Sequence, residues 1–236
     1  MITISNLTKR YDQFTALDHV SVSVEKNEFV VFLGANGSGK STLFKCIAGL
    51  TDYSGKISVN GFDAFTEGKK VRSHIGFMSQ YCGLHQDLTI EETIRFYAAL
   101  RRVNPETGNE FLKHCNLFER KSDKVGSLSG GMKQRLLFAV SLLGNPEVLI
   151  LDEPLASLDL TSFRLIIDWL GELKNDGKTI IVSTHLGSEI HDLADRFVIL
   201  NEGKISNQPV TDFLTLYNIQ TKSKPTILPI SQTGTF

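Results

Sequence analysis

Residues 29–42 read Phe29-Val-Val-Phe-Leu-Gly34-Ala-Asn36-Gly37-Ser38-Gly39-Lys40-Ser41-Thr42, an uncharged apolar run followed by a glycine-rich turn, a lysine and two hydroxyl residues. The apolar run predicts a buried strand, and the apolar spacing after Thr42 predicts a helix. The spacing G-x-x-x-x-G-K-[ST] between them suits a triphosphate, whose dense charge needs backbone N–H groups, a helix N-terminus and a cation. An ordinary glycine-rich turn is the alternative, but the strand and the helix beside it favour a phosphate-binding loop.

Strand patterns surround this stretch in the first 80 residues. Residues 20–24 alternate with period two and predict a half-exposed strand, whereas the continuous run 29–33 predicts a central one. Shorter strands are expected at 2–4, within 55–61 and at 75–78. This part of the chain therefore predicts a β-rich region around an α/β core.

Helical patterns without strand signals occupy residues from about 85 to 145. Thr89-Ile-Glu-Glu92 matches the capping box that opens a helix, and a second helix is expected from near Pro105 to His114. The change of pattern predicts a helical lobe inserted into the α/β core.

A second glycine-containing turn, Leu128-Ser129-Gly130-Gly131-Met132, precedes an apolar helix that is expected to stop at 144–146. A serine and two glycines before a helix leave free N–H groups at the positive end of the helix dipole, with a hydroxyl beside them. Such a turn suits an anion, although an ordinary flexible helix entry has the same composition.

Two adjacent carboxylates, Asp152 and Glu153, follow an apolar run at 148–151 and precede a proline. Carboxylates at the tip of a buried strand are costly unless a metal ion or a proton transfer uses them. In a P-loop protein the aspartate holds Mg²⁺ and the glutamate can take the proton of an attacking water. The alternative is a strand that simply leaves the core.

His185 directly follows another apolar run, 178–184, which predicts a buried strand. Ligands bind at the carboxyl ends of strands in parallel sheets, so His185 is expected at a ligand-binding edge.

Composition and charge limit the classes of protein to which this chain can belong. The net charge of −1 over 236 residues disfavours a nucleic-acid partner, and no apolar window is long enough to span a bilayer. The start of the chain, 1–6, is strand-like rather than a leader, so the chain is expected to be cytosolic and unanchored. Cys46, Cys82 and Cys115 form no CxxC pair, so free thiols are expected rather than a zinc site or disulfides.

The last part of the chain carries weaker signals. A helix with Ile190 and Leu193 is expected after His185, followed by a hairpin of 196–200 and 204–206. Residues 209–236 are expected to form an irregular tail.

These pieces, in this order, resemble the ATP-binding subunit of ABC transporters over roughly residues 1–208. The resemblance implies a RecA-like P-loop NTPase core with an N-terminal antiparallel β subdomain and an inserted helical subdomain at about 85–145. The matching motifs are Walker A at 34–42, the Q-loop at Gln80, the signature at 128–132, Walker B at 149–153, the D-loop at 156–159 and the H-loop at His185.

The resemblance also implies ATP and Mg²⁺ as cofactors. Glu153 would be the general base, Lys40 would hold the β- and γ-phosphates, and His185 would contact the γ-phosphate. The implied Mg²⁺ residues are Ser41, Gln80 and Asp152. The implied nucleotide-binding residues are Tyr11, which would stack on adenine, Gly34, Asn36, Gly37, Ser38, Gly39, Lys40, Ser41, Thr42, Gln80, Ser129, Gly130, Gly131 and Asp159.

The resemblance implies partners as well. Ser129 and Gly131 would reach the ATP of a second ATP-binding subunit, identical or different, and Asp159 would cross the interface between the two. Separate transmembrane permease subunits would receive the motion beside Gln80 and residues 81–87, with this chain peripheral on the cytoplasmic face of a membrane. No nucleic acid is expected.

Met132 replaces the commoner glutamine of the signature, and Gly-Gly-Met-Lys with a nearby arginine resembles the branch that serves ABC-2-type exporters. Two other functions stay open at this point. One is a soluble ABC-type ATPase that acts on nucleic acid or ribosomes, and the other is a nucleotide-binding regulatory module that does not turn over.

Overall fold

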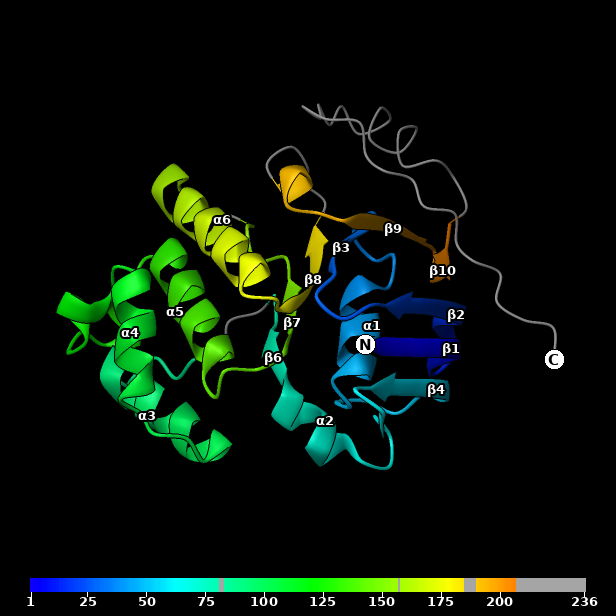
Figure 1. The fold of residues 1–236 in the computed structure, drawn as a ribbon, viewed down its shortest axis with the longest axis horizontal. Helices are drawn as coiled ribbons and strands as arrows, with labels where there is room; N and C mark the ends of the chain where they lie inside the picture. The colour runs from blue at the N-terminus through cyan, green and yellow to red at the C-terminus, as the bar shows by residue number, and fades with distance from the viewer. Residues whose placement is uncertain (81–82, 157, 185–189, 207–236) are drawn as a thin grey trace.

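The computed structural model describes residues 1–80, 83–156, 158–184 and 190–206, and in this part of the chain two β-sheets and a set of helices form (Figure 1). The strand order is β2-β1-β4-β5 in the four-stranded sheet and β10-β9-β3-β8-β7-β6 in the six-stranded sheet. Among the described residues, every helix is too short or too polar to cross a membrane.

The four-stranded sheet is antiparallel. Its members are β1 (Ile2–Tyr11), β2 (Phe14–Val24), β4 (Ser54–Val59) and β5 (Phe62–Asp63). Strand β1 pairs with both β2 and β4, so that Ile4 lies opposite Val22 on one side and Ile57 on the other. This sheet is the N-terminal antiparallel subdomain that the resemblance implied.

The six-stranded sheet is parallel apart from its last hairpin. Its members are β3 (Phe29–Leu33), β6 (Ile75–Met78), β7 (Val148–Asp152), β8 (Thr179–Thr184), β9 (Arg196–Asn201) and β10 (Lys204–Ile205). Strand β3 lies between β8 and β9, which confirms that the uncharged run at 29–33 is central. Because β3, β7 and β8 are parallel, their carboxyl ends share one edge of the sheet.

Helix α1 (Lys40–Ile47) packs between the two sheets, as Figure 1 shows. Alternate residues of β3 face opposite sides of the sheet. Val30 and Phe32 join the core around α1, while Phe29, Val31 and Leu33 join the core under the α-helices of residues 90–175. The Phe32 and Phe44 rings meet edge to face at 5.6 Å between centroids. The phosphate-binding loop is therefore held by a strand buried on both faces and a helix buried between two sheets.

Among the described residues, four further α-helices lie together at one end of Figure 1, while α2 (Gly68–His74) lies apart from them near β4. They are α3 (Ile90–Arg101), α4 (Thr107–His114), α5 (Gly130–Leu142) and α6 (Leu160–Asn175), with 3₁₀ turns at Phe118–Arg120 and Val125–Ser127. Trp169 of α6 packs against Phe138 of α5 with ring centroids 5.0 Å apart. The capping box is confirmed, because Thr89 and Glu92 exchange both hydrogen bonds at the start of α3.

Several elements differ from the sequence predictions. Helix α2 (Gly68–His74), strand β5 and helix α6 are not predicted by the pattern analysis. The expected helix at Ile190 and Leu193 is, within the described residues, a 3₁₀ turn at Ile190–Asp192. The fold class is confirmed, whereas the limits 1–208 and 85–145 stay predictions and the tail at 209–236 lies outside the described residues.

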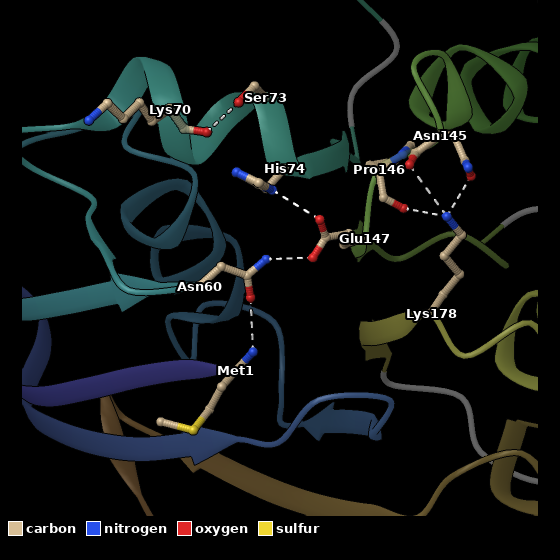
Figure 2. A network of polar contacts seen from close by, with 9 residues as sticks. All are labelled: Met1, Asn60, Lys70, Ser73, His74, Asn145, Pro146, Glu147 and Lys178. Atoms are coloured by element: carbon tan, nitrogen blue, oxygen red, sulfur yellow. Dashed lines mark hydrogen bonds and ion pairs between the residues drawn. The ribbon is translucent and has the colours of Figure 1, made fainter.

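A polar network ties the two sheets together at the amino ends of the parallel strands (Figure 2). Asn60, in the turn after β4, accepts a hydrogen bond from the Met1 amino group at 3.0 Å and donates one to Glu147 at 3.0 Å. The other Glu147 carboxylate oxygen lies 3.3 Å from Nδ1 of His74. Nearby, Lys178 donates to the Asn145 side chain and to the Pro146 carbonyl. This edge is thus structural, and the opposite edge is left for the candidate site.

The contact between β6 and α5 gives a testable prediction at Gly76. A Cβ there would collide with the Ser141 carbonyl oxygen and would lie 2.7 Å from Leu149 Cδ2 and 2.8 Å from Pro146 Cγ. Because a backbone oxygen cannot move aside, we expect Gly76→Ala to lower the free energy of unfolding by about 1–3 kcal/mol, measured by chemical denaturation. The control is Gly171→Ala on α6, where a Cβ meets only Leu193 at 3.6 Å, and equal effects of the two variants would contradict the argument.

Candidate functional site

The loop from Gly34 to Gly39 joins the end of β3 to the start of α1. A Cβ on Gly34 would collide with the Leu200 carbonyl oxygen and with Ser38, so only glycine fits there. Gly37 and Gly39 have φ of +82° and +107°, in the left-handed region that favours glycine. Gly39 is the N-cap of α1 and supplies no side-chain cap. The first N–H groups of α1 are therefore left for an anionic ligand.

Lys40 is the first residue of α1, directly after this loop, and is 6% exposed. Its Nζ donates to the carbonyl oxygens of Gly34 at 2.7 Å and Ala35 at 3.1 Å, and lies 3.9 Å from Glu153 Oε1. Burial lowers the pKa of the Lys40 ammonium, while the charges of Glu153 and Asp152 oppose that shift. A bound phosphate would add negative charge beside the ammonium and favour its protonated form.

The two carboxylates lie at the carboxyl end of β7, where the sequence predicts them. Asp152 is 2% exposed, and its Oδ1 accepts a hydrogen bond of 2.6 Å from the Ser183 hydroxyl. Glu153 is 4% exposed and has φ of +52°, a left-handed conformation that is uncommon for a residue with a side chain. Such a conformation costs about 1–3 kcal/mol and persists where the surrounding structure enforces it, often at functional sites.

The donor set fits ATP with Mg²⁺. Two buried carboxylates face a single buried ammonium, and the buried Ser38 hydroxyl has no hydrogen-bond partner among the described residues. Within those residues, no group of three or more His, Cys, Asp or Glu side chains could hold a metal ion without further ligands. Mg²⁺ prefers one or two carboxylates together with phosphate oxygens and water, so Asp152 and Ser41 suit it only when a nucleotide is present.

Helix α5 begins at the signature segment. Ser129 is its N-cap, and the Ser129 hydroxyl accepts a hydrogen bond from the Met132 N–H at 3.3 Å. Ser129 and Gly130 are exposed, which leaves this helix start open to solvent. Helices α5 and α1 belong to cores on opposite faces of the six-stranded sheet (Figure 1). The structure therefore does not bring the signature segment onto the phosphate-binding loop of the same chain.

Asp159 has a role within the chain that the sequence analysis does not foresee. Its carboxylate caps α6 by accepting from the Ser162 N–H at 2.8 Å and the Ser162 hydroxyl at 2.9 Å. These hydrogen bonds hold the pKa of Asp159 below its usual range. A Cβ on Gly131 would lie 2.8 Å from Asp159 Oδ2 and 2.9 Å from the Ser162 hydroxyl. The starts of α5 and α6 thus pack against each other through a glycine.

Tyr11 lies at the turn between β1 and β2, where it pairs with Phe14. The two residues are 44% and 63% exposed, so both rings present apolar surface to solvent. Nζ of Lys9 lies 4.6 Å from the centroid of the Tyr11 ring. Phe14 is a second exposed ring at this turn that the sequence analysis does not single out.

Of the other predicted motif residues, the structure describes Gln80 but not His185. Gln80 follows β6 and is exposed, whereas His185, Ser157 and Tyr81 lie outside the described residues. Two further residues at the site were missed: Ser183, which contacts both carboxylate residues, and Gln134, which contacts the Glu153 backbone. Ser183 adjoins the end of a predicted strand, but nothing in the sequence pattern pairs Gln134 with Glu153.

Known proteins are similar to this chain over most of its length. The family model described as ABC transporter matches residues 17–156. This chain belongs to the ABC transporter family. An uncharacterized ABC transporter ATP-binding protein of Methanocaldococcus jannaschii, MJ1023, is 35% identical over 208 residues, which are 86% of this chain and 75% of that protein. The linearmycin resistance ATP-binding protein LnrL of Bacillus subtilis is 33% identical over 87% of this chain and 68% of its own length.

Solved structures of ABC cassettes have the same fold. The dimeric structure of a post-hydrolysis state of the ATP-binding cassette MJ0796, bound to ADP and Pi, has a TM-score of 0.82 and 28% identity, covering 89% of this chain and 98% of that one. A second dimeric structure of MJ0796 has a TM-score of 0.81 and 30% identity, covering 88% and 97%. The chain is thus an ATP-binding cassette of an ABC transporter, and its enzymatic activity is ATP hydrolysis.

The packing of Gly131 against the N-cap of α6 gives a testable prediction, for which the neighbouring Gly130 supplies the control variant. A Cβ on Gly131 must displace Asp159 or Ser162, whereas a Cβ on Gly130 meets nothing within 4 Å. We expect Gly131→Ala to lower the free energy of unfolding by about 1–2 kcal/mol through loss of the cap. Gly130→Ala should be neutral or stabilising by up to about 1 kcal/mol, since alanine favours helix. Denaturant titration of both variants tests the difference, and a destabilised Gly130→Ala variant would count against it.

Proposed function

We propose that this chain is half of an ATP-driven motor that powers transport of a substrate through separate membrane subunits. The observation that carries the proposal is the meeting of the glycine loop, buried Lys40 and buried Glu153 at one edge of the parallel sheet, with the signature segment on the other face. The glycine loop and the signature segment would each form one side of a nucleotide site. A second copy or a related subunit, arranged head to tail, would complete both.

In the proposed reaction, Lys40 and the N–H groups of residues 37–42 bind the β- and γ-phosphates of ATP. Glu153 accepts the proton of a water that attacks the γ-phosphorus, and the leaving group is ADP. Because both Glu153 and Asp152 are nearly inaccessible to solvent, the proton transfer takes place in a site of low dielectric. Mg²⁺, held by Asp152, Ser41 and Gln80, would neutralise charge on the phosphate oxygens.

The remaining predicted residues have proposed roles at the edges of this reaction. His185 would contact the γ-phosphate, and Tyr11 would stack on adenine. Ser129 and Gly131 would bind the γ-phosphate held by the partner subunit, with Asp159 at the interface. The dimeric structures of the similar cassette MJ0796 support an arrangement of this kind.

Coupling to membrane subunits is supported by the names of relatives and is part of the proposal. Similar proteins include the glutamine transport protein GlnQ of Bacillus subtilis, 34% identical over 89% of this chain, and a probable sulfate/thiosulfate import protein of Chlorella vulgaris, 36% identical over 91%. These two proteins and the linearmycin resistance protein LnrL are named for different substrates, so the relatives do not identify the substrate of this chain.

We propose that the chain lies peripherally on the cytoplasmic face of a membrane. Membership of the ABC-2 branch stays a prediction from Met132. None of the comparisons favours a nucleic-acid partner.

Replacing Glu153 with glutamine tests the proposed base. Glu153→Gln keeps the size of the side chain but cannot accept the proton, so we expect turnover of ATP to fall by about 10²- to 10⁴-fold. ATP binding should persist, and size-exclusion chromatography with ATP should show a trapped dimer. Lys40→Ala is the contrasting variant, because it should lose ATP binding as well. Wild-type turnover in Glu153→Gln would rule out the assignment.

Replacing Tyr11 with alanine tests the proposed adenine platform. Stacking of a base on an aromatic ring is worth about 1–3 kcal/mol by alanine substitution, so Tyr11→Ala should weaken ATP binding by roughly 5- to 150-fold. Tyr11→Trp should bind ATP normally, and isothermal titration calorimetry would measure both. Phe65→Ala is the control, since Phe65 is 65% exposed and belongs to no predicted motif. Equal losses for Tyr11→Ala and Phe65→Ala would refute a specific platform.

A further inference from the structure

The backbone conformation of Glu153 needs an explanation that the proposed roles do not supply. Glu153 follows β7 with φ of +52°, in a region that side-chain-bearing residues rarely occupy, and it is almost fully buried. The direction of its carboxylate depends on this conformation, because φ fixes where the Cα–Cβ bond points. Whatever stabilises the left-handed conformation therefore also aims the carboxylate.

Ser183 of β8 holds the amino side of this residue. The Glu153 N–H donates to the Ser183 hydroxyl oxygen at 2.9 Å, and the same hydroxyl donates its own hydrogen to Asp152 Oδ1 at 2.6 Å. Ser183 is completely buried, so water does not compete for these bonds. A hydroxyl has one hydrogen, and its donation to Asp152 leaves the lone pairs directed at Glu153. Ser183 thereby orients two consecutive residues.

Gln134 of α5 holds the carboxyl side. Its Nε2 lies 3.3 Å from the carbonyl oxygen of Glu153 and 3.3 Å from that of Pro154. Both partners are acceptors, so the amide nitrogen, with its two hydrogens, must face them. The Glu153 carbonyl also accepts from the Ala156 N–H at 3.2 Å, which closes a turn around the residue. Side chains of β8 and α5 thus hold, by hydrogen bonds, the two peptide groups on either side of the Glu153 Cα.

We propose that Gln134 and Ser183 are positioning residues that lock Glu153 in its left-handed conformation and so aim its carboxylate. The inference rests on the proposed role of Glu153 as general base. Neither residue belongs to the phosphate-binding loop, and the hydrogen bonds of the Gln134 side chain to the described residues go to the backbone oxygens of Glu153 and Pro154. Loss of Gln134 therefore lowers turnover and leaves ATP affinity unchanged.

The main experiment uses Gln134, because its half-buried side chain can be replaced with less risk to folding than the fully buried Ser183. Gln134→Leu removes the donor at similar volume, and Gln134→Glu sets a carboxylate oxygen against two carbonyl oxygens. Since small misplacements of a catalytic group cost up to about 10²-fold, we expect kcat to fall by about 10- to 100-fold. The KM for ATP should change less than about twofold, as for a group that acts only in the chemical step.

Ser141→Ala is the matched control. Ser141 is also buried, lies on the same helix and donates its hydroxyl hydrogen to a backbone carbonyl, that of Phe138 at 2.7 Å. Its loss should reduce stability to an extent comparable with the Gln134 variants but leave kcat at the wild-type value. A similar fall of kcat in Ser141→Ala would show that general destabilisation, rather than positioning, lowers the rate.

A double-variant cycle with Glu153→Gln separates this inference from the proposed function. If Gln134 acts through Glu153, Gln134→Leu has no further effect on the residual single-turnover rate of Glu153→Gln. The same fold-loss in both backgrounds would overturn the positioning role while leaving Glu153 as the base. A raised KM with unchanged kcat in Gln134→Leu would overturn it as well. Wild-type turnover in Glu153→Gln alone would remove the proposed base and, with it, this inference.

Discussion

The structure depends on keeping an ammonium buried beside carboxylates. Lys40 and Glu153 are almost inaccessible to solvent, and their charged atoms lie 3.9 Å apart. Three strands and one helix must hold these groups in register, because misaligned buried charges are costly. The central position of β3, the parallel pairing of β7 with β8 and the packing of α1 between two sheets supply that register. Two carboxylates stand against one ammonium, which suits a cation, while the uncapped start of α1 suits phosphate oxygens.

The sequence predicts what depends on local patterns. Walker A, the capping box at Thr89, the central strand at 29–33 and the final hairpin each have a signal within a few residues, and the structure contains all of them. Long-range side-chain contacts leave no such signal. The pairing of Gln134 with the Glu153 backbone spans 19 residues, and that of Ser183 with Asp152 spans 31. Both bonds exist only because α5 and β8 are brought to β7 by the fold.

Asp159 illustrates how the same residue can be predicted for one reason and found in another setting. Its identity in the D-loop implies a place at a subunit interface, whereas its carboxylate caps α6 within the chain. Helix α6 itself is not predicted, because the sequence analysis assigns no element between the D-loop and the strand that begins near residue 178. An N-cap aspartate before an apolar helix is a recognisable local pattern, so Asp159 and the residues after it do carry a helix signal.

The close contact of Gly131 with the α6 cap has a mechanical consequence. A glycine at this point leaves no side chain to compress or slide, and the starts of α5 and α6 therefore touch as rigid surfaces. The two helices also share the aromatic contact between Phe138 and Trp169 further along their length. The two helices are thus in contact both at their starts and further along their length. We therefore expect a displacement of the exposed start of α5, near Ser129, to move α6 together with α5.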